Sequence, residues 1–154
     1  MFVPILTTQA LTAKVRPGIT IESEVLEFKA EAACLASRAG AQETARDIAQ
    51  MANSWGGSIV IGVTEARAPN GGYATAAAIQ GIANGEELRR WLAHSVRPWL
   101  APHTLPFTDA IIPTPDGGRV LVVNVPPHKD GVVAVWHTGQ RNQMEFPLRT
   151  SFGK

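Results

Sequence analysis

The chain has 154 residues, which is the size of one domain and enough to bury a hydrophobic core. Apolar residues make up 45% of the sequence and charged residues 18%, a composition that excludes an intrinsically disordered chain. Fourteen Lys and Arg against thirteen Asp and Glu give a net charge of +1. This balance argues against a protein that binds nucleic acid through bulk positive charge alone, although a local basic face is compatible with it.

The sequence also indicates the cellular compartment and whether the chain crosses a membrane. Cys34 is the single cysteine, so no internal disulfide can form and a reducing compartment is expected. No run of about 18 apolar residues is present that would cross a membrane as a helix. The first basic residue is Lys14, so the N-terminus lacks the positive start of a signal peptide. We therefore expect a soluble, cytoplasmic domain with no membrane partner.

In chain order, residues 1–19 are expected to form a lead-in with a short helix, which Pro17 and Gly18 would end. Residues 19–29 mix β-branched, aliphatic and aromatic side chains with glutamates and predict a strand. Residues 41–53 predict the clearest helix, because their apolar side chains recur at i, i+3, i+4 and i+7 and form one stripe.

The apolar run at residues 58–63 predicts a short strand buried on both faces, and residues 64–75 predict a loop. Asn84 is expected to cap a second helix at residues 85–97, which a proline ends. Further strands are expected at residues 105–112, 119–125, 131–137 and 144–149. This order of elements predicts an α+β domain over residues 20–154, in which a mixed β-sheet packs with two or more helices.

Three glutamates, Glu22, Glu24 and Glu27, lie within six residues. Carboxylates this close repel each other unless they point apart, face water or share a cation. Strand alternation turns Leu26 and Phe28 toward the core and Glu27 away from it, so Glu22 joins Glu27 on one side only if the chain bends between them. One interpretation is a solvated strand. The other is a site for Mg²⁺ or Mn²⁺, which are hard cations that prefer oxygen ligands.

Glu65 follows the strand predicted at residues 58–63. In sheets flanked by helices, functional side chains collect at the ends of strands. The Glu65 carboxylate could complete a set with Glu22 and Glu27, or it could be a solvated loop residue. The spacing in the sequence does not decide between the two.

The segment at residues 53–57, Asn-Ser-Trp-Gly-Gly, is the most distinctive stretch of the chain. It predicts a helix C-terminus followed by a glycine turn. The small residues would also let a ligand or a nucleic-acid backbone approach closely. We expect the four tryptophans mainly in the core, but Trp55 or Trp136 could stack on bases if exposed.

Basic residues are slightly more frequent in the second half of the chain. The candidate nucleic-acid contacts are Lys29, Arg89, Arg90, Arg97, Arg141 and Arg149. Scattered surface charge is the alternative interpretation of these residues. The four histidines and the lone cysteine lack the spacing of a zinc site, and the sequence contains neither a phosphate-binding P-loop motif nor a nucleophile elbow.

Two blocks of the sequence carry a family resemblance. Residues 22–29 resemble the opening E-S-x-x-x-E-F-K of the Schlafen AlbA-type domain. Residues 52–63 are similar to the family's block A-N-[ST]-x-G-G-x-[IVL]-x-I-G-V. The strand at residues 120–126, which ends in Val-Pro, and Phe-Pro-Leu-Arg at residues 146–149 are weaker similarities. The resemblance covers about residues 20–152.

The resemblance implies a nucleic-acid-binding α+β domain, which in bacteria often stands at the front of longer, regulator-like chains. In animal Schlafen proteins the similar domain can cleave RNA through a metal-dependent trio of carboxylates. Two positions of this trio match Glu22 and Glu27. The third, an aspartate in the family, falls at Glu65, which keeps the charge and adds a methylene. Mg²⁺ or Mn²⁺ is the cofactor that such a trio implies.

Three functions remain open at this point. The first is a nucleic-acid-binding module for DNA or RNA, such as the front module of a bacterial transcriptional regulator. The second is a metal-dependent endonuclease of the RNase type, with Glu22, Glu27 and Glu65 as metal ligands and catalytic residues. The third is a protein-interaction domain, such as a homodimer formed by its strand edges. Steep salt dependence of nucleic-acid binding favours the first two functions, and a requirement for Mg²⁺ or Mn²⁺ favours the second.

Overall fold

The computed structural model describes residues 1–68, 71–136 and 143–148. In chain order its elements are α1 (Thr8–Lys14), β1 (Leu26–Lys29), α2 (Glu31–Leu35), α3 (Arg38–Ala52), β2 (Gly57–Ile61), β3 (Val63–Ala66), β4 (Thr75–Ile79), α4 (Gly85–Trp91), the π-helical turn η1 (Leu92–Val96), the 3-10 turn η2 (Arg97–Trp99), β5 (Leu100–Ala101), β6 (Thr108–Pro113), β7 (Arg119–Val125), β8 (Ala134–Trp136) and β9 (Met144–Glu145). None of the helices described is long and apolar enough to span a bilayer.

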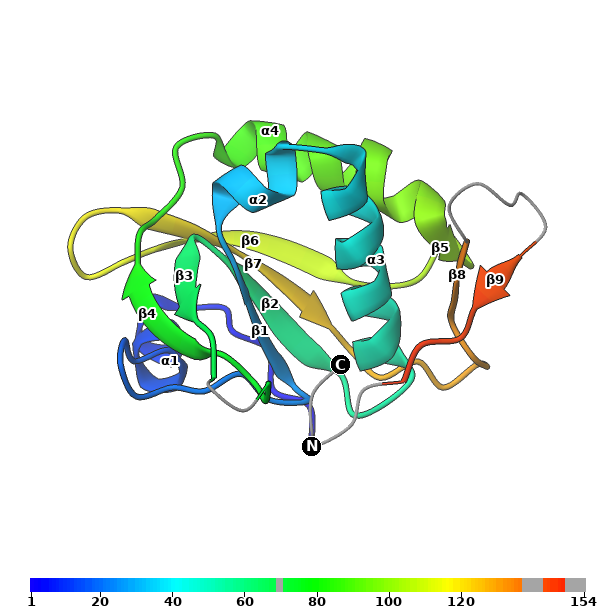
Figure 1. Ribbon diagram of the computed structural model, residues 1–154, viewed down its shortest axis with the longest axis horizontal. Coiled ribbons are helices and arrows are strands. Elements are labelled where there is room, and N and C mark those ends of the chain that lie inside the picture. Colours follow the sequence, from blue (N-terminus) through cyan, green and yellow to red (C-terminus); the bar gives the residue numbers. More distant parts are fainter. Residues whose placement is uncertain (69–70, 137–142, 149–154) are drawn as a thin grey trace.

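A four-stranded mixed sheet in the order β1-β2-β7-β6 forms the centre of the fold (Figure 1). β1 and β2 run parallel, and the other two pairs are antiparallel. Parallel neighbours need a crossover connection, and α2 and α3 supply it. A two-stranded sheet of β3 and β4 and a three-stranded sheet of β5, β8 and β9 complete the fold. The predicted α+β class with a mixed sheet is confirmed.

Strand alternation divides the hydrophobic core between the two faces of the central sheet. Ile59 and Ile61 of β2 pack in the cluster that includes α3 and α4, whereas Val60 packs in the cluster that includes Leu11 of α1. Strand β7 alternates between the same two clusters. Strands covered on both faces have nearly continuous apolar sequences, which is why this run could be predicted as a buried strand.

The second predicted helix is confirmed only in part. Regular α4 ends at Trp91, and the chain continues through η1 and η2. Asn84 makes no side-chain cap. Instead, the carboxylate of Glu31 in α2 accepts hydrogen bonds from the backbone N–H groups of Ala83 at 3.1 Å and Asn84 at 2.9 Å. A carboxylate at a helix N-terminus is stabilising, and no local pattern could reveal one that comes from residue 31.

Several predicted strand limits were wrong. The strand expected at residues 19–29 shortens to β1, because a tight turn precedes it. The loop expected at residues 64–75 contains most of β3, and β4 was not predicted because its three alanines have low strand propensity. β5 was also missed. β8 and β9 are shorter than expected, and residues 137 and 149, where those strands were expected to end, lie outside the described residues.

Candidate functional site

A tight turn brings Glu22 beside Glu27. Ser23 and Leu26 form an antiparallel bridge, with backbone N···O distances of 3.0 and 3.3 Å. In antiparallel pairing the residues before and after such a bridge lie opposite each other, so Glu22 faces Glu27. Both side chains are buried, at 7% and 3% exposure. The chain therefore bends between Glu22 and Glu27, as a site shared by the two carboxylates requires.

Backbone groups hold the Glu22 carboxylate in place. Its Oε1 accepts a hydrogen bond from the N–H of Phe28 at 2.9 Å, and its Oε2 accepts one from the N–H of Ala74 at 3.4 Å. The backbone N–H of Glu22 in turn donates to the carbonyl of Ala74 at 2.7 Å. A carboxylate oxygen carries two lone pairs, so one that accepts a hydrogen bond can also bind a cation.

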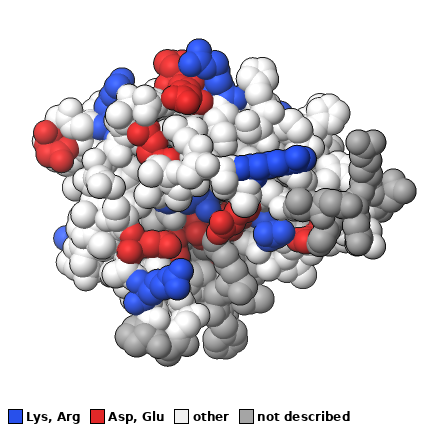
Figure 2. All heavy atoms as spheres, turned by 45° about the horizontal axis from the view of Figure 1, so that its top comes forward, with Lys and Arg blue, Asp and Glu red and all other residues white. Residues whose placement is uncertain are grey.

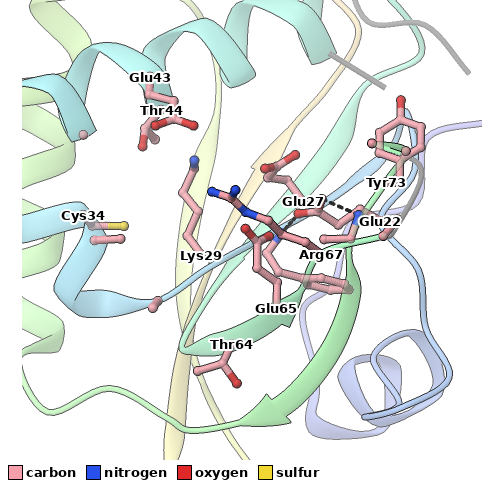
Figure 3. A pocket seen from close by; sticks show the side chains of 18 residues that line it. Glu22, Glu27, Lys29, Cys34, Glu43, Thr44, Thr64, Glu65, Arg67 and Tyr73 are labelled. Atoms are coloured by element: carbon pink, nitrogen blue, oxygen red, sulfur yellow. Dashed lines mark hydrogen bonds between the residues drawn. The ribbon is translucent and has the colours of Figure 1, made fainter. Parts of the chain in front are cut away.

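Two backbone irregularities position Glu65. Gly62, with φ of +117°, separates β2 from β3, and a side chain is strained at that dihedral. The ladder between β3 and β4 then shifts register between Thr64 and Glu65. Such bulges re-aim side chains and are frequent next to active sites. Figure 3 shows Glu65 and Glu27 directed into the same pocket.

The structure brings together the three carboxylates expected to hold a metal. One oxygen from each of Glu22, Glu27 and Glu65 lies within 4.8 Å of the others. At an effective dielectric constant of 20, two negative charges at that distance repel by about 3.5 kcal/mol, and a bound cation would offset this repulsion. Ligand oxygens about 2.1 Å from Mg²⁺ lie at most about 4.2 Å apart, so the three oxygens would need to move only slightly closer together to bind one ion. The donor set fits Mg²⁺ or Mn²⁺.

These carboxylates line a cavity of about 660 Å³. Small-ligand sites typically have volumes of roughly 300–1,000 Å³. Glu43 and Thr44 of α3 line its opposite wall, and Arg67 enters from the end of β3 (Figure 3). Thr44 is buried, and its hydroxyl has no hydrogen-bond partner among the described residues.

Sequence reasoning did not place Arg67, Glu43 or Thr44 beside the three carboxylates. Arg67 could have been found from its position, because residues two apart in extended chain point to the same side and Arg67 follows Glu65 by two. Glu43 and Thr44 gave no such signal. They reach the cavity only because α3 packs against one face of the central sheet.

Lys29 extends into the same region and forms an ion pair with α3. Its Nζ lies 2.8 Å from Oδ2 of Asp47, with side-chain exposures of 10% and 1%. Burial by itself lowers the pKa of Lys29, but the charge of Asp47 and the hydrogen bond to it outweigh burial, so the pKa of Lys29 is raised above its ordinary value. Lys29 remains protonated, and its charge is largely matched within the fold.

The other candidate nucleic-acid contacts lie in different settings. The guanidinium of Arg97 donates to the carbonyls of His103 and Leu105 at 3.0 and 2.8 Å and lies 4.0 Å from the ring centre of Phe107. Burial lowers the pKa of Arg97. Arg89 pairs with Asp109 at 2.6 Å, and this hydrogen bond raises its pKa.

Of the remaining candidates, Arg90 is exposed, whereas Arg141 and Arg149 lie outside the described residues. Figure 2 shows Lys and Arg side chains intermixed with Asp and Glu on the displayed face. Such mixed charge is consistent with the small net charge of the chain. Contacts to a phosphate backbone would therefore depend on individual side chains rather than on a strong positive field.

The glycines after α3 serve the packing of the protein itself. A Cβ on Gly56 would lie 2.8 Å from both Pro127 and the carbonyl of Val125, and one on Gly57 would lie 2.8 Å from Met51. These contacts favour the structural interpretation of the two glycines over close approach of a ligand. The expectation that the tryptophans lie in the core is wrong for Trp55, which is 70% exposed.

The fold and this pocket define a class of protein: an α+β domain with a carboxylate-lined cavity. Residues of β1, of α3 and of the β3–β4 hairpin line this cavity. The sequence matches the family described as Schlafen, AlbA_2 over residues 22–151. The chain belongs to this family.

One solved structure shares the fold at low sequence identity. It is the solution structure of the N-terminal domain of a protein from Nitrosomonas europaea described as related to the ATP-dependent DNA helicase RecG. The TM-score is 0.54 at 20% identity, and the match covers 84% of this chain and 82% of that domain. Comparison with curated protein sequences gives no significant match.

Proposed function

We propose that this domain binds nucleic acid, with a backbone phosphate placed in the carboxylate-lined cavity beside a divalent cation. The observation that carries this proposal is the convergence of Glu22, Glu27 and Glu65 with Arg67 in one cavity. The family resemblance supports it, as does the helicase-related description of the protein that shares the fold. A role as the front module of a bacterial transcriptional regulator in the cytoplasm is consistent with such binding.

The charges lining the cavity make the cation necessary for this function. Four glutamates face two basic side chains in the lining: Glu22, Glu27, Glu43 and Glu65 against Lys29 and Arg67. Lys29 is already paired with Asp47. A phosphate entering this excess of negative charge is repelled unless a cation lies between it and the carboxylates. Binding should therefore require Mg²⁺ or Mn²⁺ as well as respond to salt.

The same convergence favours phosphodiester hydrolysis as the second candidate function. Glu22 and Glu27 are buried and held by the fold, so they would fix a Mg²⁺ or Mn²⁺ ion, and Glu65 would complete its ligand set. A cation held there supplies an activated water and neutralises charge on the phosphate. The fold contributes fixed positions for the ligands and a cavity large enough to admit a phosphate group.

The decisive experiment uses labelled single-stranded RNA, structured RNA and duplex DNA, each with Mn²⁺ or with EDTA, read for both mobility shift and cleavage. Glu27→Gln removes one ligand charge at nearly constant size. Glu43→Gln is the matched control, because it removes a charge from the same cavity but lies outside the cluster of three carboxylates. We expect Mn²⁺-dependent binding that Glu27→Gln abolishes and Glu43→Gln largely retains.

The outcomes separate the candidate functions. Cleavage that disappears with EDTA and in Glu27→Gln supports the nuclease, and a Mn²⁺-dependent shift without cleavage supports binding alone. Absence of any shift with all three nucleic acids overturns both. A sedimenting dimer in that last case would favour the interaction-domain alternative.

A further inference from the structure

We propose that Arg67 is the residue that anchors the phosphate in the carboxylate-lined cavity, and that its contact forms only when the divalent cation is present. This inference rests on the proposed function, which it deepens by assigning the anion-binding side chain. Arg67 is exposed and lines the cavity together with the three clustered carboxylates. Figure 3 shows Arg67 directed into the cavity that Glu27 and Lys29 also line.

The surroundings of the two basic side chains in the cavity distinguish their roles. Lys29 is fixed by Asp47 at 2.8 Å and is mostly buried. Arg67 takes part in none of the ion pairs found among the described residues. Its charge is therefore the one in this lining that a ligand anion can engage without breaking an ion pair within the fold.

The chemistry of arginine fits a phosphate oxygen pair. The guanidinium is planar, stays charged at all accessible pH values and presents two parallel N–H donors to a phosphate. Glu65 and Arg67 are two residues apart at the end of β3, so a phosphate held by Arg67 would lie next to a cation bound at Glu65. The strand thereby presents a metal ligand and a phosphate ligand side by side.

The excess of carboxylates makes the two binding events cooperative. Without a cation, the field of the glutamates attracts the guanidinium and repels the phosphate. A bound cation neutralises that field, and Arg67 becomes available to the phosphate. Replacing Arg67 with a neutral residue should therefore weaken nucleic-acid binding with Mn²⁺, yet leave Mn²⁺ binding unchanged or slightly tighter. A purely structural role of Arg67 would weaken the binding of both nucleic acid and Mn²⁺.

The test compares Arg67→Gln and Arg67→Lys with the wild-type chain. Fluorescence anisotropy with a labelled 12-nucleotide RNA and a matching single-stranded DNA gives the oligonucleotide Kd, with Mn²⁺ and with EDTA. If the probe is cleaved, KM replaces Kd. Isothermal titration with Mn²⁺ alone gives the cation affinity. Arg16→Gln is the control, because it removes the same charge from an exposed site outside this cavity.

With Mn²⁺ present, we expect Arg67→Gln to raise the Kd for the oligonucleotide roughly 10- to 150-fold, because the variant loses a pair of charge-assisted hydrogen bonds. The slope of log K for oligonucleotide binding against log salt concentration should decrease in magnitude by about 0.7 to 0.9, because one phosphate contact is lost. Arg67→Lys should recover part of the loss, and Arg16→Gln should change the Kd less than about threefold, as expected for a distant charge.

Three results would overturn the assignment. In the first, Arg67→Gln behaves like Arg16→Gln, and the contact to phosphate lies elsewhere. In the second, Arg67→Gln also abolishes Mn²⁺ binding, and the residue supports the carboxylates instead of the ligand. In the third, the wild-type chain binds neither oligonucleotide, and the proposed function fails together with this inference. Failure of the inference alone leaves wild-type binding intact.

Discussion

Nζ of Lys29 on β1 lies 2.8 Å from Oδ2 of Asp47 on α3, and this ion pair connects the strand that carries Glu27 to the helix that forms the opposite wall of the cavity. Both side chains are nearly excluded from solvent. A buried pair of this kind contributes little net stability compared with an apolar pair, but removal of one partner leaves an uncompensated charge. The pair therefore fixes the geometry of the site more than it stabilises the fold.

Asp47→Ala is expected to lower the free energy of unfolding by about 3 to 5 kcal/mol, because it leaves the Lys29 charge buried without its partner. The double variant Lys29→Met/Asp47→Leu should recover most of this loss. Urea unfolding of both variants and of the wild-type chain measures the difference. A double variant no more stable than Asp47→Ala would contradict this account.

Glu65→Gln should not lower the melting temperature of the metal-free protein, because it relieves repulsion of about 3.5 kcal/mol from each neighbouring carboxylate, reduced by the solvent exposure of Glu65. The same variant should lose most of the rise in melting temperature that Mn²⁺ produces in the wild-type chain, since ligand binding stabilises the folded state. Thermal scans with Mn²⁺ and with EDTA test both effects. Equal Mn²⁺ stabilisation of the variant would exclude Glu65 from the ligand set.

Gly56→Ala should cost more stability than Gly18→Ala, although both glycines have φ of +76°. The shared backbone strain costs about 1 to 2 kcal/mol. A Cβ on Gly18 meets nothing within 4 Å, whereas one on Gly56 lies 2.8 Å from Pro127 and from the Val125 carbonyl. Such overpacking typically adds about 1 to 3 kcal/mol. Equal losses in urea unfolding of the two variants would show that packing contributes nothing at Gly56.

Cys34 should react slowly and should make the fold less stable in alkali. Burial raises the pKa of the Cys34 thiol from 9.0 to about 11. At pH 8 its thiolate fraction is then about 100-fold lower than in the unfolded chain, so thiol labelling should be at least that much slower without urea.

Between about pH 9 and 11 the unfolded chain loses the thiol proton while the folded chain keeps it, so stability falls as the pH rises. The loss approaches about 2 kcal/mol near pH 11. Urea unfolding across this pH range should show a smaller decline for Cys34→Ala. The same decline in both proteins would assign it to other groups.

Elements that are specified by a local sequence pattern could be predicted from the sequence. The apolar stripe of α3 and the continuous apolar run of β2 each predict both an element and its burial. The acidic residues at positions 22, 27 and 65 could also be selected as candidates, because their spacing and chemistry are visible in one dimension. The family resemblance added their grouping as an expectation.

Which partners these residues contact depends on long-range packing. The turn at Ser23–Leu26 makes Glu22 face Glu27, and the register shift in β3 aims Glu65 at both. Lys29, which the sequence suggested as a nucleic-acid contact, forms an ion pair with Asp47. Each of these results depends on backbone bends and on helix packing over the sheet, which involve residues distant in sequence. Local patterns encode which side chains are available, whereas long-range packing decides which charges are matched within the fold and which remain for a ligand.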